Sequence, residues 1–297
     1  MKRAANFHQN KNRGGNIMYK ILKKKILNPT VTLMEIDAPF VAKKAEPGQF
    51  IILRVDKDGE RIPLTVADFD REKGIVTIIF QVVGATTEKL NHLNEGDSIC
   101  DFVGPLGVPS HVEGLKKVAV VGGGVGCAIA YPIAKKLHQL GANVHSIVGF
   151  RNKDLVILED EFKAASDAFF MMTDDGSYGK KGLVTDALRE LLENGEQYDE
   201  VIAIGPLVMM KFVCKLTKEY NIKTIVSMNP IMIDGTGMCG CCRLTVGGKV
   251  KFACVDGPDF DGHEVDFDES IERAKMYQPF ERKAHEEVCN LFKKEVH

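Results

Sequence analysis

The sequence of 297 residues contains no tryptophan, and its longest apolar stretch, residues 118–134, is broken by glycines and a proline. No segment approaches the roughly 20 consecutive apolar residues that a membrane-spanning helix needs. The first 17 residues are polar and lack the apolar core of a secretory signal. Neither sign of charge dominates, since 39 Lys and Arg face 41 Asp and Glu, for a net charge of −2. This balance argues against nucleic-acid binding through bulk positive charge.

What is present is an ordinary globular composition, with 44% hydrophobic and 27% charged residues. That much apolar surface excludes disorder as a description of the whole chain. At roughly 150 residues per domain, the length suggests about two domains. We expect a cytoplasmic protein with reduced cysteines, in which residues 1–17 form a disordered extension and Met18 is a plausible natural start.

Short strand-like segments predict a small antiparallel β-barrel over residues 18–113. Turn residues such as Pro47-Gly48 separate the strands. We interpret Thr87–Leu93 as one short helix, and Gly104–Gly107 as a loop that leads out of the barrel. The predicted strands are Tyr19–Leu27, Val31–Ile36, Phe50–Val55, Ile62–Ala67 and Ile75–Val83.

Over residues 114–230, strands alternate with helices, which predicts βαβ units and a parallel α/β sheet. The first strand, Val118–Val121, is wholly apolar, as expected of a strand buried on both faces. The chain is therefore predicted to be a multi-domain α+β protein. The remaining strands of this part are predicted at Val144–Phe150, Phe169–Thr173, Val201–Ile204 and Thr224–Met228.

A glycine-rich turn follows the first strand of this sheet and reads Gly122-Gly123-Gly124-Val125-Gly126. Glycines let a phosphate approach the backbone, and the following helix offers free N–H groups and a partial positive charge. Cys127 stands where the last glycine of the usual dinucleotide motif is found. The second strand is followed by Arg151, whereas the usual NAD motif has an acid near this position. The local chemistry therefore does not distinguish NAD from NADP. Arg151 is equally compatible with a solvated surface role.

The eight cysteines are unevenly placed. Residues 231–297, which we expect to form a cluster loop and a C-terminal tail, contain five of them, and four of these five lie within one short stretch. Cys239 and Cys242 form a C-x2-C pair, and Cys254 follows. Plant-type [2Fe–2S] sites use C-x4-C-x2-C…C, and the first position of that frame is occupied here by Asp234. A carboxylate can ligate iron, so the frame is complete with one substitution. The alternative is zinc, with His263 as the nearest histidine.

A barrel, a nucleotide-binding sheet and an iron–sulfur loop together suggest electron transfer. NAD(H) delivers two electrons as hydride, whereas the cluster takes one at a time. A group between them must accept two electrons and release one, and a flavin is the usual converter. Arg61-Ile-Pro63-Leu64-Thr65 resembles the flavin motif of the ferredoxin–NADP reductase superfamily. Phe80-Gln81-Val-Val-Gly84-Ala-Thr86-Thr87 resembles the second flavin segment of that superfamily.

Nearly all of residues 18–260 resemble the electron-transfer subunits of dihydroorotate dehydrogenase B. The similarity is greater to the small subunits of NADH-dependent reduced ferredoxin:NADP oxidoreductase, because the dihydroorotate-type subunits have a cysteine where this chain has Asp234. The resemblance implies an electron-bifurcating heterodimer whose larger subunit has its own FAD and two [4Fe–4S] clusters and handles ferredoxin and NADP(H). It also implies FAD, NAD(H) and a [2Fe–2S] cluster in this subunit.

The resemblance and the motifs together give a set of expected site residues. We expect no catalytic side chain, because hydride transfer to a flavin needs positioning more than an acid or a base. The expected metal ligands are Asp234, Cys239, Cys242 and Cys254. The expected cofactor-binding residues are Arg61, Pro63, Leu64, Thr65, Phe80, Gln81, Gly84, Thr86, Thr87, Gly123, Gly124, Val125, Gly126, Arg151, Asp174, Asp175, Gly176, Gly205 and Pro206.

Two other functions remain open from the sequence. One is the electron-transfer subunit of dihydroorotate dehydrogenase B itself, whose partner is an FMN-containing barrel enzyme. The other is a non-catalytic module that binds zinc and a nucleotide. A visible spectrum separates the second from the rest, because such a module is colourless.

The ligand assignment of Asp234 is testable by substitution. A carboxylate is a harder and weaker electron donor to iron than a thiolate is, so we predict that Asp234→Cys keeps the cluster but shifts its midpoint potential. The measurement is a redox titration followed by electron paramagnetic resonance. An unchanged spectrum with an unchanged potential contradicts ligation by Asp234.

Overall fold

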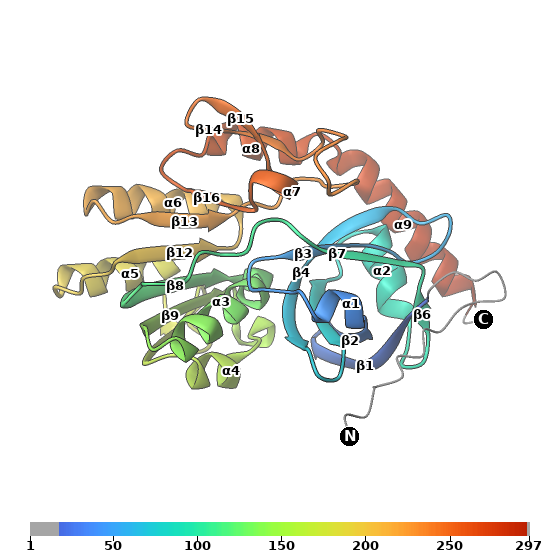
Figure 1. Cartoon of the computed structure of the whole chain (residues 1–297), viewed down its shortest axis with the longest axis horizontal. Helices are drawn as coiled ribbons and strands as arrows, with labels where there is room; N and C mark the ends of the chain where they lie inside the picture. The colour runs from blue at the N-terminus through green and yellow to red at the C-terminus, as the bar shows by residue number, and fades with distance from the viewer. Residues whose placement is uncertain (1–17, 296–297) are drawn as a thin grey trace, which may run out of the picture.

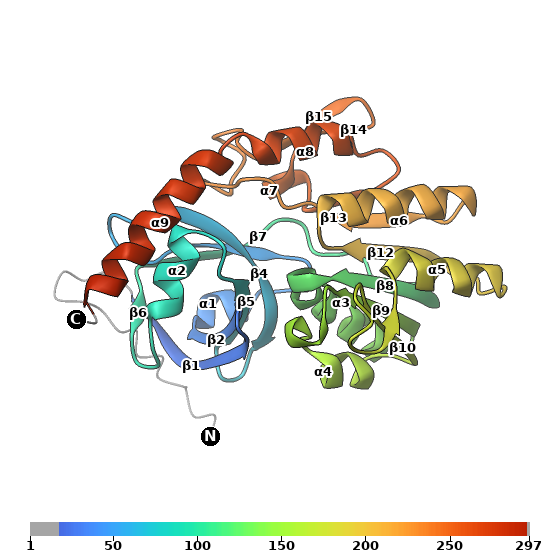
Figure 2. The ribbon, with the colours of Figure 1, turned by 180° about the vertical axis from the view of Figure 1, so that it is seen from behind.

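A computed structural model describes residues 18–295, so the predicted extension of residues 1–17 lies outside the described residues. A β-barrel and an α/β layer lie side by side, and the C-terminal segment lies over both (Figures 1 and 2). Within residues 18–295, none of the helices has the length and apolar character needed to cross a membrane.

The barrel is a seven-stranded antiparallel sheet in the order β6-β1-β2-β5-β4-β3-β7. Its two end strands, β6 (Ser98–Ile99) and β7 (Asp101–Leu106), are separated in sequence only by Cys100. The ends of the sheet therefore meet, and the barrel is nearly closed, as predicted. The remaining elements of this part are β1 (Tyr19–Asn28), β2 (Val31–Asp37), β3 (Phe50–Arg54), β4 (Arg61–Asp70), β5 (Ile75–Gln81), α1 (Pro39–Ala42) and α2 (Ala85–His92).

One prediction for the barrel is wrong, because Gly104–Leu106 is not a loop. These residues form the end of β7, which pairs with β3 through Phe50 and Leu106. Glycine and proline are tolerated there because β7 lies at the end of the sheet, where a missing N–H donor costs no ladder hydrogen bond.

The α/β layer is built on a sheet in the order β11-β10-β9-β8-β12-β13-β16, whose strands are parallel except β16. The predicted parallel sheet is thus confirmed, and its central strand β8 is buried between layers of helices. Its strands are β8 (Lys117–Gly123), β9 (Asn143–Phe150), β10 (Ala168–Thr173), β11 (Lys180–Lys181), β12 (Glu200–Ile204) and β13 (Thr224–Ser227). Its helices are η1 (Gly124–Gly126), α3 (Cys127–Gln139), η2 (Lys153–Leu155), α4 (Glu159–Ala164), α5 (Val184–Glu193) and α6 (Leu207–Glu219).

The C-terminal segment returns to the α/β layer, which the sequence does not predict. Strand β16 (Asp259–Asp261) pairs antiparallel with β13 and extends the sheet by one strand. A small hairpin precedes β16, and two helices follow it (Figure 1). These elements are β14 (Arg243–Val246), β15 (Lys249–Phe252), α7 (Ala253–Asp256), α8 (Phe267–Lys275) and α9 (Gln278–Glu295).

Asp259 of β16 joins all three parts of the molecule. Its carboxylate accepts a hydrogen bond of 2.5 Å from the hydroxyl of Ser110, which lies in the linker between the barrel and the α/β layer. The backbone N–H of Ser110 donates to the carbonyl of Pro47 in the barrel, at 2.9 Å. In the same linker, Val108 N donates to Gly257 O at 2.7 Å. These polar contacts around one carboxylate therefore add to the apolar clusters that hold the three parts together.

The stability of this junction is expected to depend on pH. Burial raises the pKa of Asp259 from 3.8 to about 6. The folded state therefore binds a proton more tightly than the unfolded chain, and this stabilisation is complete below about pH 4 and is lost as the pH rises through about 6.

We predict that Asp259→Asn, which keeps an acceptor for Ser110, is more stable than the unaltered protein by on the order of 3 kcal/mol above pH 7. The gain should shrink steadily as the pH falls toward 4. Urea unfolding of both proteins across this pH range measures it, and a difference that does not vary with pH contradicts the prediction.

Candidate functional site

The two segments predicted to bind flavin lie on adjacent strands of the barrel. Strand β4 contains Arg61, Pro63, Leu64 and Thr65, and it pairs with β5, which ends at Phe80 and Gln81. The chain then turns into α2, which contains Thr86 and Thr87 and whose N-cap is Gly84. The two strands and the helix start thus form one continuous surface, which suits a flavin ring and its pyrophosphate.

The start of α2 is organised by Thr87. Its hydroxyl oxygen accepts hydrogen bonds of 3.0 Å from the backbone N–H groups of Val83 and Gly84. The neighbouring Thr86 is buried and donates its hydroxyl hydrogen to Glu60 at 3.1 Å. These bonds fix the direction in which the helix begins, and an anion is favoured at such a helix N-terminus.

The glycine turn lies where the order of the parallel strands reverses. From β8 the chain proceeds outward through β9 and β10, whereas β12 and β13 lie on the other side of β8. Ligands of open α/β sheets bind at this reversal, beyond the carboxyl ends of the strands. Gly123, Gly124, Val125 and Gly126 follow β8 there. Gly205 and Pro206 follow β12 at the same place.

Gly126 is required by close packing of the backbone. A Cβ atom at this position would lie 2.6 Å from the carbonyl oxygen of Ile204 and 2.7 Å from Cα of Gly205. The turn after β8 and the turn after β12 therefore contact each other directly, and only a residue without a side chain fits between them.

The other predicted nucleotide contacts lie at the same edge of the sheet. Arg151 follows β9, and Asp174, Asp175 and Gly176 follow β10. The N–H of Asp174 donates to Phe150 O at 3.0 Å, and that of Asp175 donates to Arg151 O at 3.3 Å. All four residues are exposed, and hydrogen bonds from Ser177 lower the pKa of Asp175. A charged, solvent-facing rim thus surrounds the glycine turn.

The nucleotide turn and the flavin strands are in contact. Residues of η1 contact β5, and α3 contacts β4. An ion pair of 2.8 Å between Lys135 of α3 and Asp68 of β4 also connects the two parts. Nucleotide and flavin held on these segments would therefore lie next to each other.

The cysteine segment folds as a hairpin that brings two of the predicted ligands together. The pairing of β14 with β15 is closed by Gly247 and Gly248, both with positive φ, which is the geometry of a two-residue hairpin loop. Because Arg243 pairs with Phe252, the residues just outside the hairpin also meet. The sulfur atoms of Cys242 and Cys254 are 3.3 Å apart, and both side chains are buried.

The other two predicted ligands lie in the loop before the hairpin. Backbone N–H groups of Ile233, Asp234 and Cys241 donate to the sulfur of Cys239 and lower the pKa of its thiol. The carboxylate of Asp234 accepts hydrogen bonds from Thr236 N at 2.9 Å and from the Thr236 hydroxyl at 2.5 Å. A loop whose N–H groups stabilise a thiolate fits an iron–sulfur cluster, in which cysteines bind as thiolates.

Cys241 lies closer to the predicted ligands than the spacing suggests. Its position between Cys239 and Cys242 predicts a side chain that points away from the cluster. In the structure the Cys241 thiol is hydrogen-bonded to Cys239, and this contact raises the pKa of Cys241.

Arg61 connects the flavin strand to the cluster loop. Its Nε donates to the carbonyl of Ile233 at 2.8 Å, one residue before Asp234. Hydrogen bonds from Thr236 lower the pKa of Asp234, and the charge of Arg61 adds to this effect. The loop also packs on the barrel at Gly235, where a Cβ atom would lie 2.8 Å from Leu106 and 3.0 Å from Ile52. No local pattern in the sequence predicts these contacts, because they join residues more than 100 positions apart.

The flavin-type barrel, the nucleotide-type sheet and the cysteine loop meet in one fold. This combination defines an iron–sulfur flavoprotein of the electron-transfer class. The family model for the iron–sulfur cluster binding domain of dihydroorotate dehydrogenase B matches residues 229–266. The chain belongs to the family of dihydroorotate dehydrogenase B electron-transfer subunits and their homologues. The iron–sulfur domain and the similarity to the ferredoxin-reductase-type structure show that its cofactors are FAD, NAD(H) and a [2Fe–2S] cluster. The iron–sulfur prediction for the cysteine loop is thus confirmed over zinc.

Three similar proteins cover almost the whole chain. A Thermotoga maritima protein described as a dihydroorotate dehydrogenase B (NAD(+)) electron transfer subunit homolog is 49% identical over 92% of this chain and 96% of its own length. An uncharacterized Clostridium beijerinckii protein from the adh 3′ region is 57% identical, over 91% and 94%. A structure of NADH-dependent reduced ferredoxin-NADP oxidoreductase, solved to study flavin-based electron bifurcation, is 45% identical over 93% and 99%, with a TM-score of 0.88.

The packing of the cluster loop on the barrel yields a prediction with a matched control. Gly235 and Gly248 both have positive φ, of +84° and +71°, but only Gly235 has close neighbours. We predict that Gly248→Ala costs about 1 kcal/mol from backbone strain alone. Gly235→Ala should cost about 1–3 kcal/mol more, because it also overpacks the contact with the barrel.

Urea unfolding and iron content measure the two effects. We expect Gly235→Ala to lose iron more readily than Gly248→Ala does. Equal stability and equal iron content of the two variants contradict the packing of this loop on the barrel.

Proposed function

We propose that this chain is the small subunit of a cytoplasmic NADH-dependent ferredoxin:NADP oxidoreductase. In this proposal it exchanges hydride with NAD(H) and passes single electrons to a larger subunit, which has its own FAD and two [4Fe–4S] clusters and which handles NADP(H) and ferredoxin. The solved bifurcating enzyme, at 45% identity and a TM-score of 0.88 over 93% of the chain, supports this choice.

The observation that carries the proposal is that three binding segments meet at one edge of the barrel. The nucleotide turn η1 contacts β5 from one side. Arg61 of β4 donates to the cluster loop at Ile233, 2.8 Å away, from the other side. Strands β4 and β5 lie between the two, so a flavin held there is next to both a nucleotide and a cluster.

When bound, FAD supplies the conversion between the hydride of NAD(H) and the single electrons of the cluster. The protein's contribution is positioning. Gly126 allows the nucleotide turn to lie against Gly205, and Thr87 fixes the helix start that faces the pyrophosphate. Cys242 and Cys254, whose sulfur atoms are 3.3 Å apart, are spaced as two ligands of one iron, and the N–H groups around Cys239 stabilise a third thiolate.

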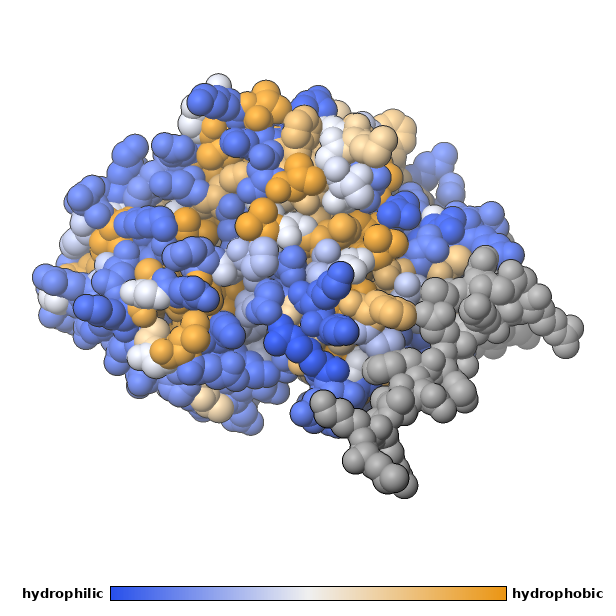
Figure 3. Space-filling view, viewed as in Figure 1, coloured by the Kyte–Doolittle hydropathy of each residue, from blue (hydrophilic) through white to orange (hydrophobic). Residues whose placement is uncertain are grey.

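Exposed apolar side chains around the cluster loop support a protein partner. Met238 is 87% exposed, although it lies one residue before Cys239, and Ile233 and Val255 are 46% and 44% exposed. Figure 3 shows apolar side chains, in orange, on the upper part of the face where the C-terminal segment lies in Figure 1. An electron leaving the cluster has to cross at a short distance, so a partner that covers this loop suits the proposal.

A second candidate is the electron-transfer subunit of dihydroorotate dehydrogenase B. The matched iron–sulfur domain and the description of the Thermotoga relative favour it. Asp234 favours the first candidate, because the dihydroorotate-type subunits resemble this chain but have a cysteine in that frame. The two candidates differ in the partner and in the substrate of the complex.

The complex purified through a tag on this chain separates the candidates. We predict co-purification of a large subunit with flavin and [4Fe–4S] clusters, and reduction of NADP+ by NADH together with reduced ferredoxin. An FMN-containing partner with dihydroorotate-dependent reduction of NAD+ contradicts the proposal and supports the second candidate.

A pair of cysteine variants tests the route of the electrons in the same complex. Cys254→Ser should lower electron delivery to the large subunit by at least about tenfold while NADH still bleaches the flavin of this subunit. Cys100→Ser, at a half-buried cysteine of the barrel, is the matched control and should behave like the unaltered complex. Full activity of Cys254→Ser contradicts a route through this cluster.

A further inference from the structure

The C-terminal helix α9 lies along α2 on the outside of the barrel, although the two are far apart in sequence (Figures 1 and 2). The face of α9 that packs against the rest of the protein contains few side chains. Between residues 278 and 291 only Val288 is buried, while Ala284, His285 and Cys289 are half-buried. One buried apolar side chain is little hydrophobic surface for holding a helix of 18 residues.

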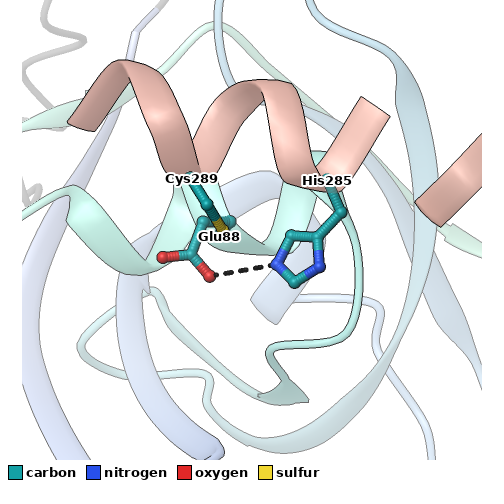
Figure 4. Close-up of side chains that lie close together, drawn as sticks. All are labelled: Glu88, His285 and Cys289. Atoms are coloured by element: carbon teal, nitrogen blue, oxygen red, sulfur yellow. Dashed lines mark hydrogen bonds and ion pairs between the residues drawn. The ribbon is translucent and has the colours of Figure 1, made fainter. Parts of the chain in front are cut away.

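Three side chains with metal-binding atoms meet between these helices. They are Glu88 of α2 and, one turn apart on the inward face of α9, His285 and Cys289. The carboxylate oxygen, the ring nitrogen and the sulfur all lie within 4.8 Å of one another, and Figure 4 shows them pointing into the space between the helices. None of the three belongs to the predicted nucleotide, flavin or cluster sites.

The spacing of these atoms suits a metal ion better than a direct bond. Nε2 of His285 is 3.4 Å from Oε2 of Glu88, which is longer than the usual hydrogen bond of about 2.9 Å. Tetrahedral zinc, with bonds of about 2.0–2.2 Å to nitrogen and oxygen, holds two such ligand atoms about 3.4 Å apart. A small movement of the Cys289 side chain would bring its sulfur into the same shell.

The chemical types of the three ligand atoms indicate which metal ion fits the site. Magnesium and calcium prefer shells made of oxygen atoms, whereas a thiolate, an imidazole and a carboxylate are the three ligand types of zinc. We propose that Glu88, His285 and Cys289 form a zinc site that attaches α9 to α2, with water as the fourth ligand.

The position of the site gives it a structural consequence. The N–H of Glu88 donates to the carbonyl of Gly84, the N-cap of α2, at 2.9 Å. Glu88 is therefore one turn from the helix start at which the flavin pyrophosphate is expected. A metal ion on Glu88 would hold α2 and α9 as one unit and so support the flavin segment from outside. This inference does not depend on which partner or substrate the complex has.

The test measures zinc in the intact holoprotein by plasma mass spectrometry, after equilibration with one equivalent of zinc and removal of loosely bound metal. We expect one zinc ion per chain in addition to the iron of the cluster. Cys289→Ser, His285→Ala and Glu88→Gln should each weaken zinc binding at least about tenfold, with iron and FAD content unchanged.

Two matched control variants leave Glu88, His285 and Cys289 unaltered. Cys100→Ser alters another half-buried cysteine, and His92→Ala alters a histidine whose Nδ1 is 3.5 Å from Oε1 of Glu88 but which lies outside the group of three. Both should bind zinc as the unaltered protein does. In X-ray absorption at the zinc edge, one sulfur neighbour at about 2.3 Å should disappear in Cys289→Ser.

Three results would overturn the proposal. One is a holoprotein that binds no zinc, which leaves an ordinary pair of Glu88 and His285. A second is zinc that all three variants bind as tightly as the unaltered protein. The third is zinc that is lost only when Cys239 is changed to serine, which places the metal in the cysteine loop.

Discussion

The fixed placement of barrel, α/β layer and C-terminal segment is the constraint on which the rest of the structure depends, and the hydrogen bond between Ser110 and the carboxylate of Asp259 helps to hold it. Ser110 belongs to the linker between barrel and α/β layer, and Asp259 belongs to the last strand of the parallel sheet. A one-electron carrier works only when its cofactors are near one another, so the three parts have to be held at fixed positions. Burial of the carboxylate strengthens this bond in a low-dielectric setting and also makes ionisation of Asp259 unfavourable.

In this arrangement, the segment predicted to bind the nucleotide and the loop that contains the cluster cysteines both contact the barrel. Strand β5 contacts the predicted nucleotide turn, β4 contacts the helix α3 that follows this turn, and Arg61 of β4 reaches the cluster loop. Glycine is used where two backbones touch, as at Gly126 and Gly205, and where the cluster loop packs on the barrel, as at Gly235. The site is thus formed by contacts between segments, as suits a reaction that depends on positioning.

Much of this was predictable from local patterns. The wholly apolar strand before the glycine turn, the alternation of strands and helices, and the frame of Asp234 with three cysteines each depend on residues close in sequence. The ends of the strands were predicted less well. Gly104–Leu106 contains residues typical of turns, yet it pairs with β3, because β3 lacked a partner on one side. Pairing with a distant strand overrides local turn preference.

The sequence by itself determined the motifs on which the predicted chemistry depends: a glycine-rich turn after an apolar strand, a flavin-type strand and a frame of Asp234 with three cysteines. Only the tertiary structure decided that these segments meet, that β16 joins the parallel sheet beside β13, and that α9 brings His285 and Cys289 to Glu88. The physical reason is the range of the interactions. Periodicity and motif spacing act over a few residues, whereas the contacts of Arg61 with Ile233 and of Ser110 with Asp259 join positions whose proximity no local pattern encodes.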